Sequence, residues 1–367
     1  MPLRRFRVMI SHACFILKKA GQSLQKTYKQ VSNQHDSAIL ECVPNFSEGR
    51  RPEVIAAIAD AIRGVEGAKL LHIDSGASAN RTVMTFAGLP EAVTEAAFRA
   101  IATAARLIDM RQHTGIHPRM GATDVCPLVP VRGISMQQAV HYARQLGERV
   151  GQELGIPVYL YEAAATRPER KNLAYIRAGE YEGFRQKIYL PEWAPDFGPQ
   201  AFQPGPGQTV IGARDFLIAY NINLDTADES IAREIAAEVR ESGRVVVQQG
   251  KKQRIPGRLK AVKAIGWYVP EFGRAQVSTN ITHIPTTPVH QVYETVKELA
   301  AKRGVRVTGS ELVGLAPLKV FTDAGAFYLP NPHAGEEELV KEAIRQLGLD
   351  DLAPFDPNQK ILEYCLK

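Results

Sequence analysis

Two periods of hydrophobic residues alternate along this chain and predict a repeated succession of strands and helices. In the first half, Val54, Ile58 and Ile62 recur at helical spacing behind Pro52, which suits the first position of a helix. Shorter apolar runs bounded by turn residues predict strands around it. The elements predicted here are a strand at 38–43, a helix from Pro52 to the Gly64–Gly67 region, strands at 69–74 and 81–86, a helix from Pro90, a strand at 125–131, a helix at 135–154 and an extra strand at 158–161.

The second half repeats the same order with different residues. Ile231, Ile235 and Val239 share one face of a helix, and Val289, Val292 and Val296 share a face of another. The predicted elements are a strand at 216–223, a helix at 228–241, strands at 265–269 and 276–281, a helix opened by Pro288 and a strand at 305–308.

A βαββαβ order that occurs twice favours an α+β fold built from duplicated ferredoxin-like subdomains, with antiparallel sheets covered by helices. The expected organisation is a basic, disordered extension at 1–37, an N-terminal subdomain at 38–216 and a C-terminal subdomain at 217–367. Pro127 and Pro130 place the strand at 125–131 at an edge of its sheet, or make it irregular, because proline cannot complete a central ladder.

Two stretches interrupt this regular pattern. The segment 193–207 is too rich in proline and glycine for helix or strand, which makes it an ordered loop or a linker. Its aromatic residues, Trp193, Phe197 and Phe202, suit either a slot for a flat heterocycle or plain packing. The segment 248–260 carries five cations and is interpreted either as a lid over an anionic ligand or as a surface excursion.

Composition narrows the functional classes. The 367 residues are 45% hydrophobic and 23% charged, as in globular proteins, which excludes a disordered or fibrous chain. The four cysteines are far apart, so the sequence indicates neither a disulfide framework nor a zinc ribbon, and a cytoplasmic location is expected. The first 36 residues hold seven of the 45 Lys and Arg but one of the 39 Asp and Glu. The remaining chain is therefore neutral, which disfavours a nucleic-acid binder.

Membrane insertion is not indicated either. The apolar run at 8–17 is too short to span a bilayer and lacks a convincing cleavage site, although a targeting peptide remains an alternative to an unstructured start. Gly205-Pro206-Gly207 suggests a phosphate loop only superficially, because proline removes the amide donors that a phosphate needs.

The segment from His113 to Asp124 concentrates the candidate chemistry. Pro118 and the nearby glycines hold His117 on a loop, where a neutral imidazole can exchange protons near neutral pH. A buried histidine satisfied by backbone hydrogen bonds is the alternative. Zinc binding by His113 and His117 is disfavoured, because Pro118 breaks the helix that would align them.

Other residues near predicted turns are weaker candidates. Asp74 ends a strand just before a turn. Its carboxylate would orient a histidine or bind a ligand amine, or Asp74 is an ordinary turn residue without a functional role. Arg119 adjoins the histidine loop and suits an acidic substrate.

The ordered motifs of the chain resemble those of the glutamate formiminotransferase family. The resemblance runs from about Ala38 to the C-terminus. It is carried by Glu41-Cys-Val-Pro-Asn-Phe-Ser-Glu-Gly49, Asn80-Arg-Thr-Val83, His117-Pro-Arg-Met-Gly121, Asp124-Val-Cys-Pro127, Pro130-Val-Arg-Gly133, Arg177-Ala-Gly-Glu-Tyr181, Trp193-Ala-Pro-Asp-Phe-Gly-Pro199, Asn221-Ile-Asn-Leu224, Pro256-Gly-Arg-Leu-Lys260 and Gly309-Ser310.

This resemblance implies transfer of a formimino group from N-formimino-L-glutamate to tetrahydrofolate, a co-substrate, during histidine breakdown. The family is similar in having two ferredoxin-like subdomains, a homodimer, a cytoplasmic location and no metal. The first 36 residues have no counterpart in the family, and the cyclodeaminase domain of the animal relatives is absent, so a separate cyclodeaminase is expected downstream.

The resemblance also implies roles for individual residues. His117 aligns with the family catalyst, and Asp74 with an acidic position that would hold or stabilise the ring. Candidates for the substrate carboxylates are Arg119, Arg81 and Lys260. The folate-contacting segment aligns with Gly198, Pro199, Gln200, Ala201, Phe202, Gln203, Pro204, Gly205, Pro206 and Gly207, although the positions from Gln200 to Pro206 differ from the animal sequences.

Two other functions compete with this one. The same fold would accept N-formylglutamate as donor, because a carbonyl oxygen and an imino nitrogen differ little in size. A non-enzymatic ligand-binding module is the second alternative, since a fold does not determine a function. An RNA platform would need basic and aromatic residues on an exposed sheet face, which the neutral chain does not indicate.

Overall fold

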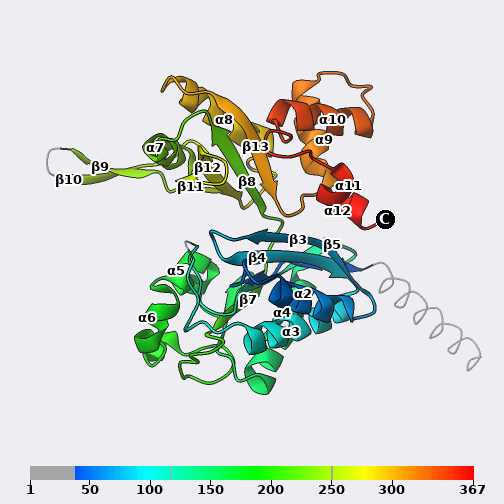
Figure 1. Ribbon diagram of the computed structural model, residues 1–367, viewed down its shortest axis with the longest axis vertical. Coiled ribbons are helices and arrows are strands. Elements are labelled where there is room, and N and C mark those ends of the chain that lie inside the picture. Colours follow the sequence, from blue (N-terminus) through cyan, green and yellow to red (C-terminus); the bar gives the residue numbers. More distant parts are fainter. Residues whose placement is uncertain (1–37, 116, 249–250) are drawn as a thin grey trace, which may run out of the picture.

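The computed structural model describes residues 38–115, 117–248 and 251–367, so the extension predicted at 1–37 lies outside the described residues. The first half contains a seven-stranded sheet (Figure 1). Its strands are β1 (Ile39–Cys42), β2 (Asn45–Phe46), β3 (Ala68–Gly76), β4 (Arg81–Gly88), β5 (Thr123–Arg132), β6 (Val158–Glu162) and β7 (Thr209–Ala213). The helices packed with it are α2 (Pro52–Arg63), α3 (Pro90–Leu107) and α4 (Met136–Glu153).

Local sequence explains where these helices begin and which faces they bury. Pro52 opens α2, and its apolar stripe, Val54, Ile58 and Ile62, is buried as the periodicity predicts. The Ser135 side chain accepts a hydrogen bond from the Gln138 amide, while the Gln138 side chain bonds back to Ser135, forming a capping box for α4. The predicted helices at Pro52, Pro90 and 135–154 are therefore confirmed.

The pairing of the first sheet is antiparallel on one side and parallel on the other. Strand β4 lies between β3 and β1, and β1 also pairs with β5, all antiparallel. Strand β2 continues the path of β1 between β4 and β5. Beyond β5, strands β7 and β6 add parallel pairs. The sheet is therefore mixed, whereas the sequence predicted an antiparallel sheet.

The strand with Pro127 and Pro130 does not lie at an edge of its sheet, so that alternative is wrong, but it is irregular, as the other alternative predicted. Strand β5 lies inside the sheet, between β1 and β7. Its ladder with β7 has four residue pairs, and its register with β1 shifts between Ile39 and Leu40, beside Pro130. These irregularities accommodate proline inside the sheet, since two of the expected amide donors are missing. Strand β7 was not predicted, so β5 was expected to have a neighbouring strand on one side alone.

Four short helical segments and a long loop connect β6 to β7. The segments are η1 (Pro168–Lys171), α5 (Leu173–Arg177), α6 (Glu180–Lys187) and η2 (Pro191–Trp193). The segment 193–207 is an ordered loop here. Trp193 stacks on Tyr175 with ring centroids 5.1 Å apart, and Phe202 lies 5.2 Å from Tyr181. These aromatic residues pack within the first half, as the plain-packing interpretation proposed.

The second half has its own sheet and its own hydrophobic core. Strands β8 (Ile218–Leu224), β11 (Val262–Val269), β12 (Arg274–Ile281) and β13 (Val307–Val313) pair antiparallel in the order β11-β12-β8-β13. Helices α7 (Glu229–Val239) and α8 (Val289–Ala301) contribute to that core. Helices α9 (Leu318–Tyr328), α10 (Glu336–Leu347), α11 (Pro357–Lys360) and α12 (Leu362–Cys365) complete this half. Strand β13 begins and ends later than the predicted strand at 305–308.

The basic segment predicted as irregular contributes instead to a hairpin. Strands β9 (Arg244–Gln248) and β10 (Lys251–Ile255) pair antiparallel and project from the second half in Figure 1. None of the described residues from 251 to 260 lines the large cavity described below. No helix within the described ranges is both long enough and apolar enough to cross a membrane.

The two sheets turn their helix-free faces toward one another. On β1, Leu40 and Cys42 enter the first core, whereas Glu41 faces away from it. On β8, Tyr220 and Ile222 enter the second core, whereas Ala219 and Asn221 face the first half. The alternation of side chains thus provides two opposed walls from segments that are distant in sequence.

Candidate active site

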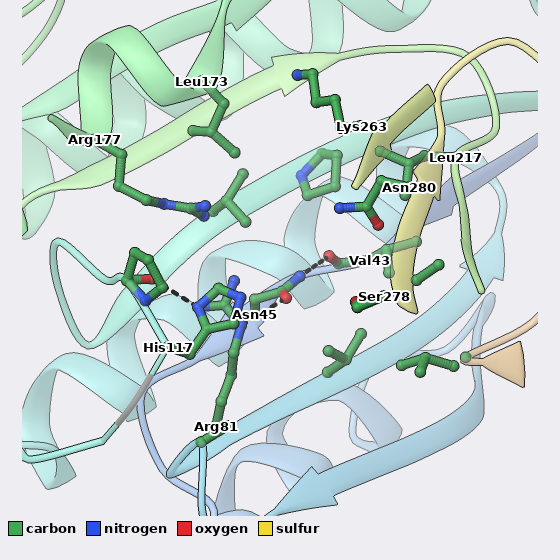
Figure 2. Close-up of a pocket in the computed structure, with 18 of the residues that line it drawn as sticks. Val43, Asn45, Arg81, His117, Leu173, Arg177, Leu217, Lys263, Ser278 and Asn280 are labelled. Carbon is green, nitrogen blue, oxygen red and sulfur yellow. Dashed lines mark hydrogen bonds between the residues drawn. The ribbon is translucent and has the colours of Figure 1, made fainter. Parts of the chain in front are cut away.

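A cavity of about 720 Å³ lies between these walls. Figure 2 shows His117, Arg81 and Arg177 grouped on one side, with Lys263, Ser278 and Asn280 supplied by the second sheet. The polar side chains that line the cavity are Glu41, Asn45, Asp74, Arg81, Thr85, His117, Tyr161, Glu162, Arg177, Glu180, Arg214, Asn221, Lys263, Trp267, Ser278 and Asn280.

His117 reaches the cavity from the loop that connects α3 to β5. Its Nδ1 lies 2.7 Å from the carbonyl oxygen of Pro118. Because a carbonyl only accepts, Nδ1 carries the proton and Nε2 remains as the acceptor. Burial, reinforced by the cations Arg81 and Arg177, lowers the pKa of His117 to about 3. The ring is therefore neutral at physiological pH, with a basic nitrogen not used by Pro118.

The cations beside His117 are held by one buried carboxylate. Asp124 is fully buried and accepts hydrogen bonds from Arg81 Nη1 at 2.7 Å and Arg177 Nη2 at 2.6 Å. The Met120 amide donates to its other oxygen at 3.1 Å. Burial alone would raise the pKa of Asp124, but Arg177 and Arg81 bring it below the ordinary value. Two cations share one anion, so this side of the cavity retains positive charge.

Arg81 and Arg177 differ in how completely the protein satisfies them. Arg81 Nε donates to the Asn45 side chain at 3.0 Å, in addition to its bond with Asp124. The buried Nε of Arg177 has no hydrogen-bond partner within the described part of the chain. A buried donor without an acceptor is costly, and a ligand oxygen would relieve that cost.

Asp74 lines the same cavity but its hydrogen bond joins the two halves. The Gly314 amide donates to Asp74 Oδ2 at 3.3 Å. Among the described residues no hydrogen bond links Asp74 to His117. Asp124, which lies close enough to act on the pKa of His117, is the acidic neighbour of the ring.

The two other cations suggested by the resemblance lie outside the cavity lining. Arg119 is buried, and its guanidinium donates to Glu180 at 3.1 Å and to Glu182 at 2.6 Å. The Lys260 ammonium is largely exposed and lies 3.7 Å from a carboxylate oxygen of Glu241. Of the three predicted carboxylate ligands, only Arg81 lines the cavity.

The segment from Gly198 to Gly207 braces the histidine loop instead of lining the cavity. The Met110 amide donates to Gly205 O at 2.9 Å, and the Ala122 amide donates to Pro206 O at 2.8 Å. Gly207 has a φ of +69°, and a Cβ there would lie 2.5 Å from Met120 O. Only glycine allows this close approach. The folate contacts of the segment stay a prediction.

Sequence analysis missed six charged residues of the cavity: Glu41, Glu162, Arg177, Glu180, Arg214 and Lys263. Glu41 was visible as the one acidic residue in an apolar strand, and alternation along that strand places it opposite the core. Arg177 lies on a helix of five residues in a region without clear periodicity. Nothing local in the sequence indicated that it would meet Asp124.

Metal ligands do not cluster in the described structure. No group of three or more His, Cys, Asp or Glu side chains within the described residues has an arrangement that would hold a metal ion.

Comparisons with known proteins match both halves of the chain to one family. Family models match residues 39–214, as the N-terminal subdomain of the formiminotransferase domain, and residues 219–367, as the formiminotransferase domain. The formimidoyltransferase-cyclodeaminase of Rattus norvegicus is 52% identical over 333 residues, which are 90% of this chain but 60% of that protein. This chain therefore spans less than two thirds of the rat relative.

Shorter relatives match along most of their own length. The glutamate formimidoyltransferase of Streptococcus pyogenes serotype M1 is 44% identical over 79% of this chain and 93% of that protein. The glutamate formimidoyltransferase of Thermoplasma acidophilum is 42% identical over 80% of this chain and 92% of that protein.

Proposed function

The chain belongs to the formiminotransferase family, and on that premise we propose that it transfers the formimino group of N-formimino-L-glutamate to tetrahydrofolate. The products are 5-formiminotetrahydrofolate and L-glutamate, as in histidine degradation. The observation that carries this proposal is the neutral ring of His117 beside Arg81 and Arg177 in a cavity between two sheets.

The reaction exchanges one carbon–nitrogen bond for another. N5 of tetrahydrofolate attacks the formimino carbon, and His117 Nε2 accepts the N5 proton as the tetrahedral intermediate forms. The imidazolium then donates that proton to the glutamate nitrogen, and the bond between this nitrogen and the formimino carbon breaks. Asp74 supplies negative charge on the cavity wall, which suits the cationic amidinium of the donor.

Arg177 is proposed as a ligand of a glutamate carboxylate, because its Nε is buried and unpartnered. We expect Arg177→Met to raise KM for formiminoglutamate about 10- to 100-fold, since a charged hydrogen bond is lost. Asp124 keeps its bond with Arg81 in this variant, so the fold persists. Steady-state kinetics measure the effect, and Arg111→Met, which removes an exposed cation bonded to Asp109, is the control. An unchanged KM would contradict the assignment.

Substrate binding is expected to change the proton affinity of His117. In the free protein its pKa of about 3 keeps the ring neutral from pH 8 down to pH 5. Carboxylates that bind beside Arg81 and Arg177 offset the field of those cations, so the pKa rises in the complex. NMR titration of imidazole-labelled protein measures both values, with the signal assigned by its loss in His117→Ala. A pKa of His117 near 6.5 in the free protein would contradict the proposal that burial and the charges of Arg81 and Arg177 lower it.

The direct test of the proposed activity is incubation with formiminoglutamate and tetrahydrofolate. The 5-formimino product should form, and kcat/KM should be higher than with N-formylglutamate. A higher kcat/KM with N-formylglutamate would reassign the protein as a formyltransferase. Binding of both compounds without turnover would support the non-enzymatic alternative.

The finer architecture is inferred in the same way. Both sheets place the second, third, first and fourth strands of a βαββαβ unit side by side, which supports duplicated ferredoxin-like subdomains. We assign them to residues 38–216 and 217–367. From the resemblance we also propose a cytoplasmic homodimer that uses tetrahydrofolate as co-substrate and no metal. Folate contacts from Gly198 to Gly207 belong to this proposal.

A further inference from the structure

Glu41 is a buried carboxylate that the proposed transfer step does not use. It lies at the middle of the first wall and is only 4% exposed, yet it lines the cavity. No hydrogen bond to its side chain is formed by the residues that the structure describes. Buried carboxylates are normally paired or hydrogen-bonded, so this arrangement requires a function.

The surroundings of Glu41 suit a flat and mainly neutral ligand. Val43, Val83, Val125 and Pro127 form apolar surface on the same wall. Arg214 also lines the cavity, and one of its N–H groups donates to Asp215 O at 2.9 Å, which leaves further donors on the guanidinium. A carboxylate and a guanidinium beside apolar surface can bind a ring that presents donors and an acceptor along one edge.

The aminopyrimidinone edge of a reduced pterin has this chemistry. Its ring N–H and its 2-amino group are adjacent donors, which match the two oxygens of one carboxylate. Its carbonyl oxygen is an acceptor for an arginine. We propose that Glu41 binds the ring N–H and 2-amino group of tetrahydrofolate, with Arg214 at the carbonyl. This inference rests on the proposed function and names the binding site of one of its substrates.

The position of Glu41 relative to His117 is consistent with transfer at N5. Asn45 lies four residues beyond Glu41, roughly 13 Å along extended backbone. Asn45 accepts a hydrogen bond from Arg81, which borders His117. The bicyclic ring and the transferred carbon fill a span of this size, with the pyrimidine at Glu41 and N5 toward His117.

The charge state of Glu41 provides an independent observable. Burial raises the pKa of Glu41 to about 7, although the cation of Arg214 opposes the rise and Glu363 of α12 adds to it. The buried Cys42 thiol adjoins it on β1. The ionised carboxylate accepts two hydrogen bonds, whereas the protonated form does not match two donors. Folate affinity should therefore increase as the pH rises through about 7.

Calorimetry with 5-formyltetrahydrofolate, which needs no turnover, tests the proposal. We expect Glu41→Gln to weaken binding about 10- to 100-fold and to abolish the pH dependence. A folate analogue without the 2-amino group should bind the unmodified protein about tenfold more weakly, but bind Glu41→Gln with no further loss. Glu162→Gln, which changes another carboxylate of the cavity, should retain the preference for the 2-amino group.

The outcomes separate this inference from the proposed function. If the unmodified protein transfers the formimino group, but Glu41→Gln binds folate normally, Glu41 is not the pterin ligand. A lower kcat in Glu41→Gln with unchanged folate affinity would likewise overturn the inference, because it would indicate a role in proton transfer. If the unmodified protein shows no transfer while folate still binds through Glu41, the proposed function fails and the pterin site stands.

Discussion

Replacing His117 with alanine is expected to lower kcat about 10²- to 10⁴-fold, the range typical of general acid–base catalysis. The imidazole is the one group proposed to carry a proton between the two nitrogens of the exchange. Arg81 and Arg177 are held by Asp124, so substrate binding should change little and KM should stay within a few-fold. Steady-state rates with formiminoglutamate and tetrahydrofolate give both parameters.

His113→Ala is a position-matched control for that experiment. His113 belongs to the same loop, where its Nε2 lies 2.9 Å from the Asn80 carbonyl oxygen and its Nδ1 accepts from Arg119. It does not line the cavity. Loss of its ring should therefore affect the loop more than the chemistry. Near-normal turnover by His117→Ala would end the assignment of the catalyst, and partial rescue of that variant by added imidazole would strengthen it.

Asp124→Asn is expected to destabilise the protein by about 3–5 kcal/mol, since breaking a buried ion pair leaves uncompensated charge. Asp124 is the shared carboxylate of Arg81 and Arg177, and the asparagine would leave both cations without an anion. Urea unfolding followed by circular dichroism measures the change in the free energy of unfolding. Because the pKa of Asp124 is lowered in the folded protein, its contribution is present above pH 4 and decreases as the pH falls below it.

A combined variant distinguishes loss of charge balance from loss of packing. Arg177→Met together with Asp124→Asn removes one of the two cations, so it should recover part of the stability that Asp124→Asn loses. A free energy of unfolding within 1 kcal/mol of the unmodified protein for Asp124→Asn alone would contradict the structural role of this carboxylate.

Much of the architecture could be predicted because short-range rules decide it. Proline at the first position, helical spacing and a capping residue indicated α2, α3 and α4 with few alternatives. Strand β7 was missed because its five residues follow a long proline-rich loop and are recognisable only through their parallel pairing with β5 and β6. Pairing between distant segments leaves little local signal, and the position of β5 was mispredicted for the same reason.

The site was predictable to a smaller extent. His117 could be singled out because Pro118 and the nearby glycines show locally that its ring lies on a shaped loop. Its charged neighbours could not be predicted, because Arg177 comes from a helix 53 residues away from Asp124. Arg119 and Lys260 looked equally suitable in sequence, yet neither lines the cavity. Arg119 is paired with Glu180 and Glu182, and Lys260 with Glu241.

The two walls of the cavity belong to separate hydrophobic cores, one in each half. The hydrogen bonds across the junction include Gly314 to Asp74 and Lys69 to the Cys365 carbonyl oxygen. If the two cores differ in melting temperature, we expect heat inactivation of the proposed transfer to follow the less stable core, because one intact wall cannot align the two proposed substrates. The temperature at which activity is lost then reports the melting temperature of the less stable core, while the spectroscopic signal of the more stable core remains unchanged.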